Sequence, residues 1–292
     1  MAAPLAAITE RAHAKVNLSL RVLGRRADGY HELLSLVAFA ETAYDTLSLE
    51  PGAPEGLVVG GETADSLAGG PENLVLRAVA AARAAKPGLR AGRLTLDKRL
   101  PVAAGIGGGS ADGAAALRLL RRANTDAADI DWHRIASSIG ADVPVCLTGR
   151  AAMMWGLGEH VEALDHFPPA WVVLANPRVG LGTADVFRAL GAPPLAVAPG
   201  IPGKPDVTTA ADLAEWLRER PNDLEAPAVR LCPAIDGVRR ALGTLDGALL
   251  ARMSGSGATC FALFTSASNA AAGARALAAA EPGWWVAQSR LI

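Results

Sequence analysis

A glycine-rich segment between a predicted strand and a predicted helix constrains this chain more than any other feature. Residues 100–112 read LPVAAGIGGGSAD; they follow the strand-like residues 93–96 and open into the helix-forming residues 114–120. The glycines let backbone N–H groups close around a ligand and allow positive φ. A helix beginning near Ser110 adds unpaired N–H groups and the positive end of its dipole at the same place. The sequence therefore predicts a phosphate-binding loop.

The loop is neither of the two commonest phosphate-binding motifs. A Walker A loop ends in Gly-Lys followed by Ser or Thr, and no lysine occurs between Lys98 and Ser110. A Rossmann turn requires a third glycine at the position that Ser110 occupies. The glycines by themselves also fit a tight turn followed by a helix cap, and that alternative stays open at this point.

Composition limits the classes of function. The chain has 292 residues, enough for one large domain or two ordinary ones, and a net charge of -1. Nearly balanced charge argues against a dedicated nucleic-acid or membrane-surface binder. The 3 cysteines form no CxxC pair, which indicates a reducing compartment. With no signal-peptide pattern and no apolar run near the ~18 residues of a membrane span, we expect a soluble cytoplasmic protein. Its oligomeric state stays open.

The order of predicted elements favours an α+β fold. Alternating apolar residues over 12–22 predict a half-buried strand that places Lys15 and Asn17 together on its polar face. Strands and helices mix without strict β-α-β alternation, which argues against a doubly wound sheet. The remaining predictions are strands at 33–39, 46–49, 151–155, 171–174, 249–253, 259–264 and 284–289, helices at 73–85, 132–139, 184–190, 210–220, 224–231, 234–242 and 267–280, and a proline-rich surface loop at 192–207.

Three motifs together resemble those of the GHMP kinases, which phosphorylate small-molecule hydroxyls and amines with ATP. The first is AHAKVNLSL at 12–20 with DGYH at 28–31; the second is the glycine loop; the third is RMSGSGATCFA at 252–262. The resemblance implies a two-domain GHMP kinase fold of the α+β class, with the active site in the interdomain cleft. We place the domains at 1–160, with the ATP loop and the catalytic pair, and 161–292.

The resemblance also assigns a catalytic pair. Phosphoryl transfer to an alcohol needs positioning, charge stabilisation and a group that accepts the hydroxyl proton. Asp142, in Gly-Ala-Asp-Val-Pro at a helix end before a strand-like run, matches the family's catalytic aspartate, and Lys15 matches its lysine partner. Taken alone, the lysine would be read as solvated and the aspartate as a turn residue. Asp112 is the rival carboxylate, although its place in the first helical turn assigns it to the helix dipole.

The ATP site implied by the resemblance is the whole glycine loop. Its residues are Pro101, Val102, Ala103, Ala104, Gly105, Ile106, Gly107, Gly108, Gly109, Ser110 and Ala111. Mg²⁺ is expected with ATP as co-substrate, because it neutralises phosphate oxygens. The sequence contains no carboxylate cluster with metal-ligand spacing, so we predict no metal site built by the protein.

The acceptor site is predicted from four residues. Tyr30 and His31 follow Asp-Gly and, in the branch of the family whose acceptor carries cytidine, would stack on the base and bind its edge. A tyrosine and a histidine here could equally be half-buried structural residues. The resemblance assigns Asn17 and Thr183 to the rest of the acceptor, although an N-cap role for the helix at 184–190 would also explain Thr183.

Two other functions compete with this interpretation. One is a GHMP kinase for homoserine, mevalonate or a sugar, against which the Tyr30–His31 pair argues. The other is a non-catalytic nucleotide-binding protein on the same fold, against which the presence of both Lys15 and Asp142 argues. An activity screen with ATP and several acceptors separates all three.

Overall fold

The computed structural model describes residues 6–66, 73–196 and 203–292. Spatial contacts divide the chain into two compact units whose segments alternate along the sequence. Unit 1 comprises Met1–Ala14, Tyr44–Val102 and Gly107–Thr148, and unit 2 comprises Lys15–Ala43, Ala103–Ile106 and Gly149–Ile292. Strands β1 (Ile8–Asn17) and β3 (His31–Glu50) each contribute to both units. The predicted boundary near residue 160 stays a prediction.

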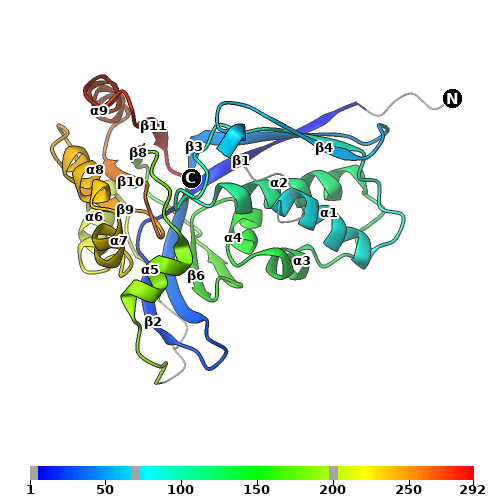
Figure 1. Ribbon diagram of the computed structural model, residues 1–292, viewed down its shortest axis with the longest axis horizontal. Helices are drawn as coiled ribbons and strands as arrows, with labels where there is room; N and C mark the ends of the chain where they lie inside the picture. Colours follow the sequence, from blue (N-terminus) through cyan, green and yellow to red (C-terminus); the bar gives the residue numbers. More distant parts are fainter. Residues whose placement is uncertain (1–5, 67–72, 197–202) are drawn as a thin grey trace. The chain divides into compact units, whose positions relative to one another are not determined.

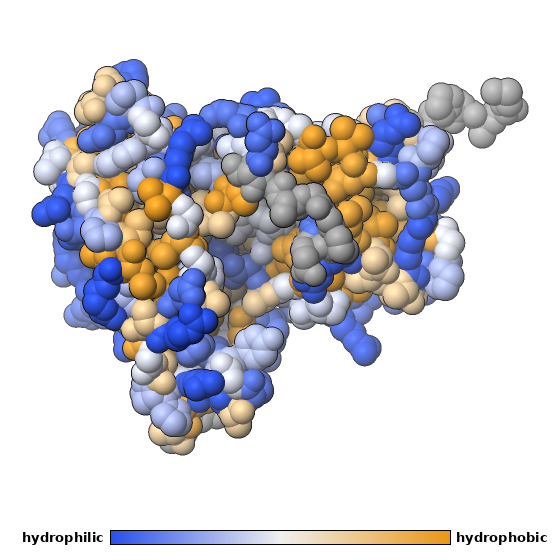
Figure 2. Space-filling model, in the orientation of Figure 1, coloured by the Kyte–Doolittle hydropathy of each residue, from blue (hydrophilic) through white to orange (hydrophobic). Residues whose placement is uncertain are grey.

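Unit 1 packs helices on one face of a small sheet (Figure 1). β5 (Arg93–Asp97) lies antiparallel to the last residues of β3 and parallel to the edge strand β4 (Gly56–Gly60). Leu47 pairs with Leu96 and Leu49 with Leu94, which places four leucines in the buried core. The helical elements are η1 (Ala64–Ser66), α1 (Leu74–Ala85), α2 (Gly108–Ala123), α3 (Trp132–Ile139) and α4 (Val143–Thr148). Figure 2 shows a hydrophobic patch over β4, where Val58 and Val59 are exposed.

Unit 2 is built on an antiparallel sheet of order β11-β8-β10-β9. Its strands are β8 (Trp171–Asn176), β9 (Leu250–Met253), β10 (Cys260–Phe264) and β11 (Trp285–Arg290). The helices are α5 (Thr183–Leu190), α6 (Ala210–Arg218), α7 (Glu225–Leu231), α8 (Ala234–Gly243) and α9 (Ala267–Ala280). Helices α8 and α9 pack against this sheet, and Ile235, Val173 and Phe264 belong to its buried core.

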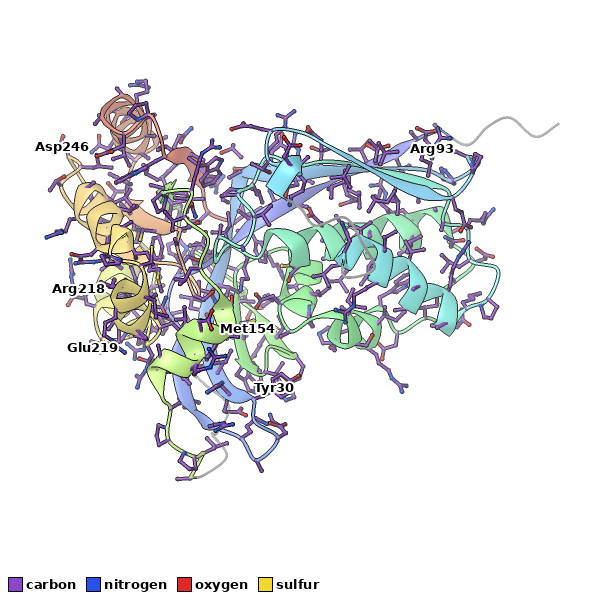
Figure 3. The ribbon with its side chains drawn as sticks, viewed as in Figure 1. Tyr30, Arg93, Met154, Arg218, Glu219 and Asp246 are labelled. Carbon is purple, nitrogen blue, oxygen red and sulfur yellow. The ribbon has the colours of Figure 1, made fainter. Side chains whose placement is uncertain are left out.

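The first part of β3 forms the other ladders of unit 2. It pairs antiparallel with β2 (Arg21–Arg25) and with β6 (Ala152–Gly156), and β6 pairs in turn with β7 (His160–Ala163). The turn between β2 and β3 carries Tyr30, which is labelled in Figure 3. This hairpin positions the second part of the first motif, residues 28–31, while Lys15 and Asn17 of the same motif lie on β1.

The α+β class and most predicted elements are confirmed. The helices expected at 73–85, 132–139 and 267–280 are present, and the side chains of Asn73, Asp131 and Ser266 cap them. Of the expected proline-rich loop at 192–207, residues 197–202 lie outside the described residues. No helix in the described ranges is long and apolar enough to span a bilayer.

Four local predictions were wrong. The strand expected at 12–22 is interrupted, because β1 ends at Asn17 and β2 begins at Arg21. The strands expected at 33–39 and 46–49 are one continuous strand, and β4 lies where no strand was predicted. Residues after Asp142 form the helix α4 and not a strand, because their apolar side chains meet α2 and α3 inside unit 1. Short apolar runs do not distinguish a strand from a buried helix.

Candidate active site

The glycine loop ends in a helix whose first turn is open. Helix α2 begins at Gly108, two residues earlier than expected, after Gly107 at φ 64°. The N-cap residue Gly107 has no side chain that could cap this end, which leaves the first N–H groups of the helix without an N-cap partner. Gly109 is exposed, and Gly107, Gly108 and Ser110 are partly exposed. Bare N–H groups at a helix N-terminus form an anion-binding surface, as the phosphate-loop prediction requires.

The middle of the loop, residues 103–106, is held by backbone contacts within unit 2. Ala104 O accepts from Thr259 N at 3.1 Å, and Ile106 O accepts from Lys15 N at 2.8 Å. Gly105 has φ 73°, and a Cβ placed there would lie 2.5 Å from Ser254 O and 2.7 Å from Gly257 N. Only glycine fits this approach, because both neighbouring atoms belong to backbone.

The three sequence motifs meet in a buried hydrogen-bond network. Asn17 N donates to Ser254 Oγ at 3.0 Å, and Ser254 Oγ donates to Gly105 O at 3.0 Å. The Asn17 side chain donates through Nδ2 to Ser35 Oγ at 2.9 Å, and Ser35 Oγ donates to Ser19 O at 2.5 Å. Motif one, motif two and motif three are therefore joined within unit 2 through a few polar atoms.

Lys15 and Asn17 are more deeply placed than the alternating pattern predicted. Lys15 is 3% exposed and Asn17 is fully buried, so the polar face of this strand does not face solvent. Asn17 Oδ1 has no hydrogen-bond partner among the described residues. A buried polar atom is normally hydrogen-bonded in a folded protein. Asn17 therefore keeps one acceptor available for a ligand group.

Of the two candidate carboxylates, Asp142 is the more accessible. Asp142 is partly exposed and directly precedes α4, where its carbonyl oxygen accepts from Cys146 N at 3.2 Å. Asp112 is 3% exposed, and its Oδ2 lies 2.8 Å from Lys98 Nζ. A general base must reach the proton that it removes, and the ion pair with Lys98 occupies Asp112. The prediction that Asp112 lies in the first turn of the helix was wrong, because α2 begins at Gly108 and its first turn holds no acidic residue; Asp112 pairs with a buried lysine instead.

The predicted base-binding pair lies beside a third aromatic residue. Tyr30 is 65% exposed, and its backbone N–H is held by Asp28 Oδ1 at 3.0 Å. The His31 ring stacks on Phe187 of α5, with centroids 4.7 Å apart and planes at 25°. Burial, followed by the charge of Arg25, lowers the pKa of His31 below 6.5, so the imidazole is neutral at pH 7. A neutral imidazole offers one donor and one acceptor.

Thr183 does not cap α5. It is the first residue of the helix, Gly182 is the N-cap, and that cap has no side-chain hydrogen bond. Its Oγ1 instead lies 2.9 Å from Ser256 Oγ in motif three. The N-cap explanation of Thr183 is therefore wrong. Its side chain forms a hydrogen bond with the Ser-Gly-Ser-Gly turn instead.

Sequence reasoning missed three residues near these motifs. Phe187 lies four residues after Thr183 on the same face of α5, a spacing that could have pointed to it. Asn222 donates through Nδ2 to Met253 O at 2.9 Å and to Gly255 O at 2.7 Å, and so holds the motif-three turn. Lys98, which directly follows β5, is 2% exposed. No sequence pattern marks Asn222 or Lys98 as buried.

The described residues offer no protein-built metal site. Within 6–66, 73–196 and 203–292, no three His, Cys, Asp or Glu side chains are grouped so that they could hold a metal ion. The expectation that the protein builds no metal site of its own stays a prediction.

Family models match both parts of the chain. The model described as GHMP kinases N terminal domain matches residues 73–150, and GHMP kinases C terminal matches residues 204–283. A 4-diphosphocytidyl-2-C-methyl-D-erythritol kinase of Parvibaculum lavamentivorans is 52% identical over 96% of each chain. The chain belongs to the GHMP kinase family. It is a small-molecule kinase, and kinases of this family use ATP.

Further relatives agree with the branch that the first motif indicated. The kinase of the same description from Methylobacterium radiotolerans is 54% identical over 97% of this chain and 99% of its own. A solved structure of 4-(cytidine 5'-diphospho)-2C-methyl-D-erythritol kinase is 36% identical, has a TM-score of 0.75, and is matched over 97% of this chain and 99% of its own. A homoserine kinase structure from Cytophaga hutchinsonii, 20% identical with a TM-score of 0.69, shares the fold. This GHMP kinase therefore resembles the cytidyl-substrate kinases in sequence and structure.

Proposed function

We propose that this chain transfers the γ-phosphoryl group of ATP to the 2-hydroxyl of 4-diphosphocytidyl-2-C-methyl-D-erythritol. The observation that carries the proposal is the sequence identity of 52% and 54%, over nearly the full length of the chain, to two kinases whose names state that acceptor. The reaction belongs to the non-mevalonate route to isoprenoid precursors. The predicted cytoplasmic location agrees with such a role and stays a prediction.

The glycine loop is proposed to bind the phosphates of ATP. Residues 101–111 would present backbone N–H groups, and the uncapped start of α2 supports this with a positive dipole end. Positive φ at Ala103, Gly105 and Gly107 turns the backbone tightly there. Mg²⁺ would arrive with ATP and neutralise phosphate oxygens.

Asp142 is proposed to accept the proton of the attacking hydroxyl, and Lys15 to stabilise the charge that develops at that oxygen. A cation beside a carboxylate favours its ionised form, which the base must have. The accessibility of Asp142 and the burial of the rival Asp112 support the choice of base. Lys15 follows in sequence the core residue Ala14 and bonds through its backbone to the loop at Ile106, which supports a fixed position for it.

The acceptor's base is proposed to bind beside His31, Phe187 and Tyr30. The stacked His31–Phe187 pair supports this, because a planar base can extend an existing stack. The neutral His31 can donate to or accept from the cytosine edge. Asn17 Oδ1, an acceptor without a donor among the described residues, and Thr183 are proposed to contact the remainder of the acceptor.

Replacement of Tyr30 tests the base site. If Tyr30 stacks on cytosine, Tyr30→Ala should weaken binding of the cytidyl acceptor by about 1–3 kcal/mol, the range for base–aromatic stacking. Because the side chain is mostly exposed, folding should be unaffected. Calorimetric titration with each substrate measures both affinities, and the ATP affinity serves as the internal control. Equal losses for ATP and acceptor would make Tyr30 a structural residue.

A screen of acceptors tests the function as a whole. The purified chain is incubated with ATP and, separately, with the cytidyl acceptor, homoserine and mevalonate, and ADP release is followed. We expect turnover with the cytidyl acceptor alone. Turnover with homoserine or mevalonate instead would assign another specificity within the family, and ATP binding without any turnover would favour the non-catalytic alternative.

A further inference from the structure

A buried ion-pair cluster lies at both flanks of the glycine loop inside unit 1. Lys98, directly after β5, contacts Asp45 Oδ2 and lies 2.8 Å from Asp112 Oδ2. The three side chains are at most 4% exposed. No residue of this cluster belongs to the proposed catalytic pair or to the loop itself.

The cluster connects the two flanks of the loop. On one side, Asp45 Oδ1 accepts from Arg99 N at 2.6 Å and from Leu100 N at 2.8 Å. On the other side, Asp112 lies in the first turns of α2, and Lys98 is its partner. A Cβ placed on Gly108 would lie 3.5 Å from Lys98 Nζ, so the ammonium lies directly beside the first residue of α2.

The lysine is not placed to bind phosphate itself. It is 2% exposed, and two carboxylates face its charge. Burial by itself would lower the pKa of Lys98, but Asp112 and Asp45 outweigh it and raise the pKa, so the ammonium remains charged. A charged lysine held between two carboxylates forms charge-assisted hydrogen bonds, which are shorter and stronger than neutral ones.

The link to α2 depends on one carboxylate oxygen. Asp112 Oδ1 has no hydrogen-bond partner among the described residues, while Oδ2 contacts Lys98. Burial is the main cause that raises the pKa of Asp112 to about 7; Lys98 opposes it and Asp45 adds to it. Asp112 Oδ2 can accept a hydrogen bond from Lys98 Nζ whether the carboxyl group is ionised or protonated. The contact between Lys98 and α2 therefore persists in both states.

We infer that Lys98 and Asp112 are positioning residues that fix the start of α2 against the end of β5 and thereby set the geometry of the ATP loop. The inference rests on the proposed role of residues 101–111 in binding ATP. Asp45 holds the residue just before the loop, because its Oδ1 accepts a hydrogen bond from Leu100 N. Reacting groups must be placed closely for transfer, since a misplacement of about 1 Å can lower the rate about 100-fold.

Two replacements of Asp112 separate positioning from charge. Asp112→Leu removes the oxygen that Lys98 binds but leaves the ion pair between Lys98 and Asp45, whose charges cancel. It should raise KM for ATP by about tenfold, the equivalent of one charge-assisted hydrogen bond. KM for the acceptor should change less than about twofold, because no proposed acceptor residue belongs to the cluster. Asp112→Asn keeps an oxygen for Lys98 and should recover most of the lost ATP affinity.

Steady-state kinetics with each substrate varied, together with thermal unfolding, checks this result. Lys86→Met, which removes a surface lysine paired with Asp129, is the matched control and should change neither KM. Unchanged KM for ATP in folded Asp112→Leu, or equal rises in both KM values, would overturn the inference. If Asp112→Leu does not fold, Lys98→Met/Asp112→Leu removes both charges and is measured in the same way. Failure of both to fold would also overturn it, because the cluster would then support the whole fold.

The same assay distinguishes this inference from the proposed function. Gly105→Ala is measured alongside as a direct perturbation of the loop. If Gly105→Ala folds and leaves KM for ATP unchanged, the proposed role of the loop in positioning ATP fails, and the inference that rests on it fails too. If Gly105→Ala raises KM for ATP and Asp112→Leu does not, the inference alone is wrong.

Discussion

Asp142→Asn is expected to lower turnover by about 10²–10⁴-fold, the usual contribution of a general base. The amide keeps the size of the carboxylate but cannot accept a proton at neutral pH, so the fold and both substrate affinities should be largely retained. Single-turnover measurement of phosphoryl transfer isolates the chemical step. Asp129→Asn, at a surface carboxylate paired with Lys86, is the control and should transfer at the wild-type rate.

Lys15→Met should lose most of the turnover as well. If Lys15 and Asp142 act as one unit, the double variant should be far less impaired than the product of the two single losses. Lys15 is 3% exposed, so unfolding of each variant must be measured to separate catalysis from stability. Wild-type chemical rates in Asp142→Asn would leave positioning alone as the mechanism, with no base.

Gly105→Ala is expected to lower kcat/KM for ATP about 100-fold and to raise KM for ATP, because the loop cannot keep its position. A Cβ at this residue would lie 2.5 Å from Ser254 O and 2.7 Å from both Gly257 N and Gly257 O. The residue also has φ 73°, a left-handed conformation that is unfavourable by about 1–2 kcal/mol for a non-glycine residue. The hydrogen bond from Ser254 Oγ to Gly105 O should weaken as the backbone moves away.

Gly109→Ala provides the matched control for this loop. A Cβ at Gly109 would meet Leu74 Cδ1 at 3.9 Å, an ordinary van der Waals contact, and its φ is not positive. Folding should therefore be retained, and the effect on ATP should be much smaller than that of Gly105→Ala. ATP titration and thermal unfolding of both variants check the comparison. Similar KM values for ATP in the two variants would show that the close approach at Gly105 does not position the loop.

Local sequence patterns were sufficient where one short segment contains the whole signal. The helix at 73–85 has its Asn73 cap and the helix at 132–139 its Asp131 cap, and both are found as expected. The order of strands and helices indicates the α+β class, and the three motifs together indicate the family. Capping and side-chain periodicity act over a few residues, so they can be recognised in a one-dimensional string.

The predictions that failed depend on contacts between distant segments. The alternation over 12–22 predicts Lys15 and Asn17 on a polar face of the strand, but both residues are buried. Asn17 N donates a hydrogen bond to Ser254 Oγ, more than two hundred residues later in the chain. The residues around Thr183 suggest a helix cap, because nothing in that segment indicates its partner Ser256, which lies far away in the sequence. Whether a polar residue is buried depends on the distant segments that pack against it, and the periodicity of its own strand contains no information about those segments.

By itself, the sequence determined the fold class, the kinase family, and the glycine loop with its following helix. Only the tertiary structure decided that Asp112 binds Lys98, that Phe187 stacks on His31, and that Asn222 holds the motif-three turn. The first group follows from short-range backbone preferences and from motif order. The second depends on buried polar and aromatic contacts, whose partners are brought together by the packing of residues that lie far apart along the chain.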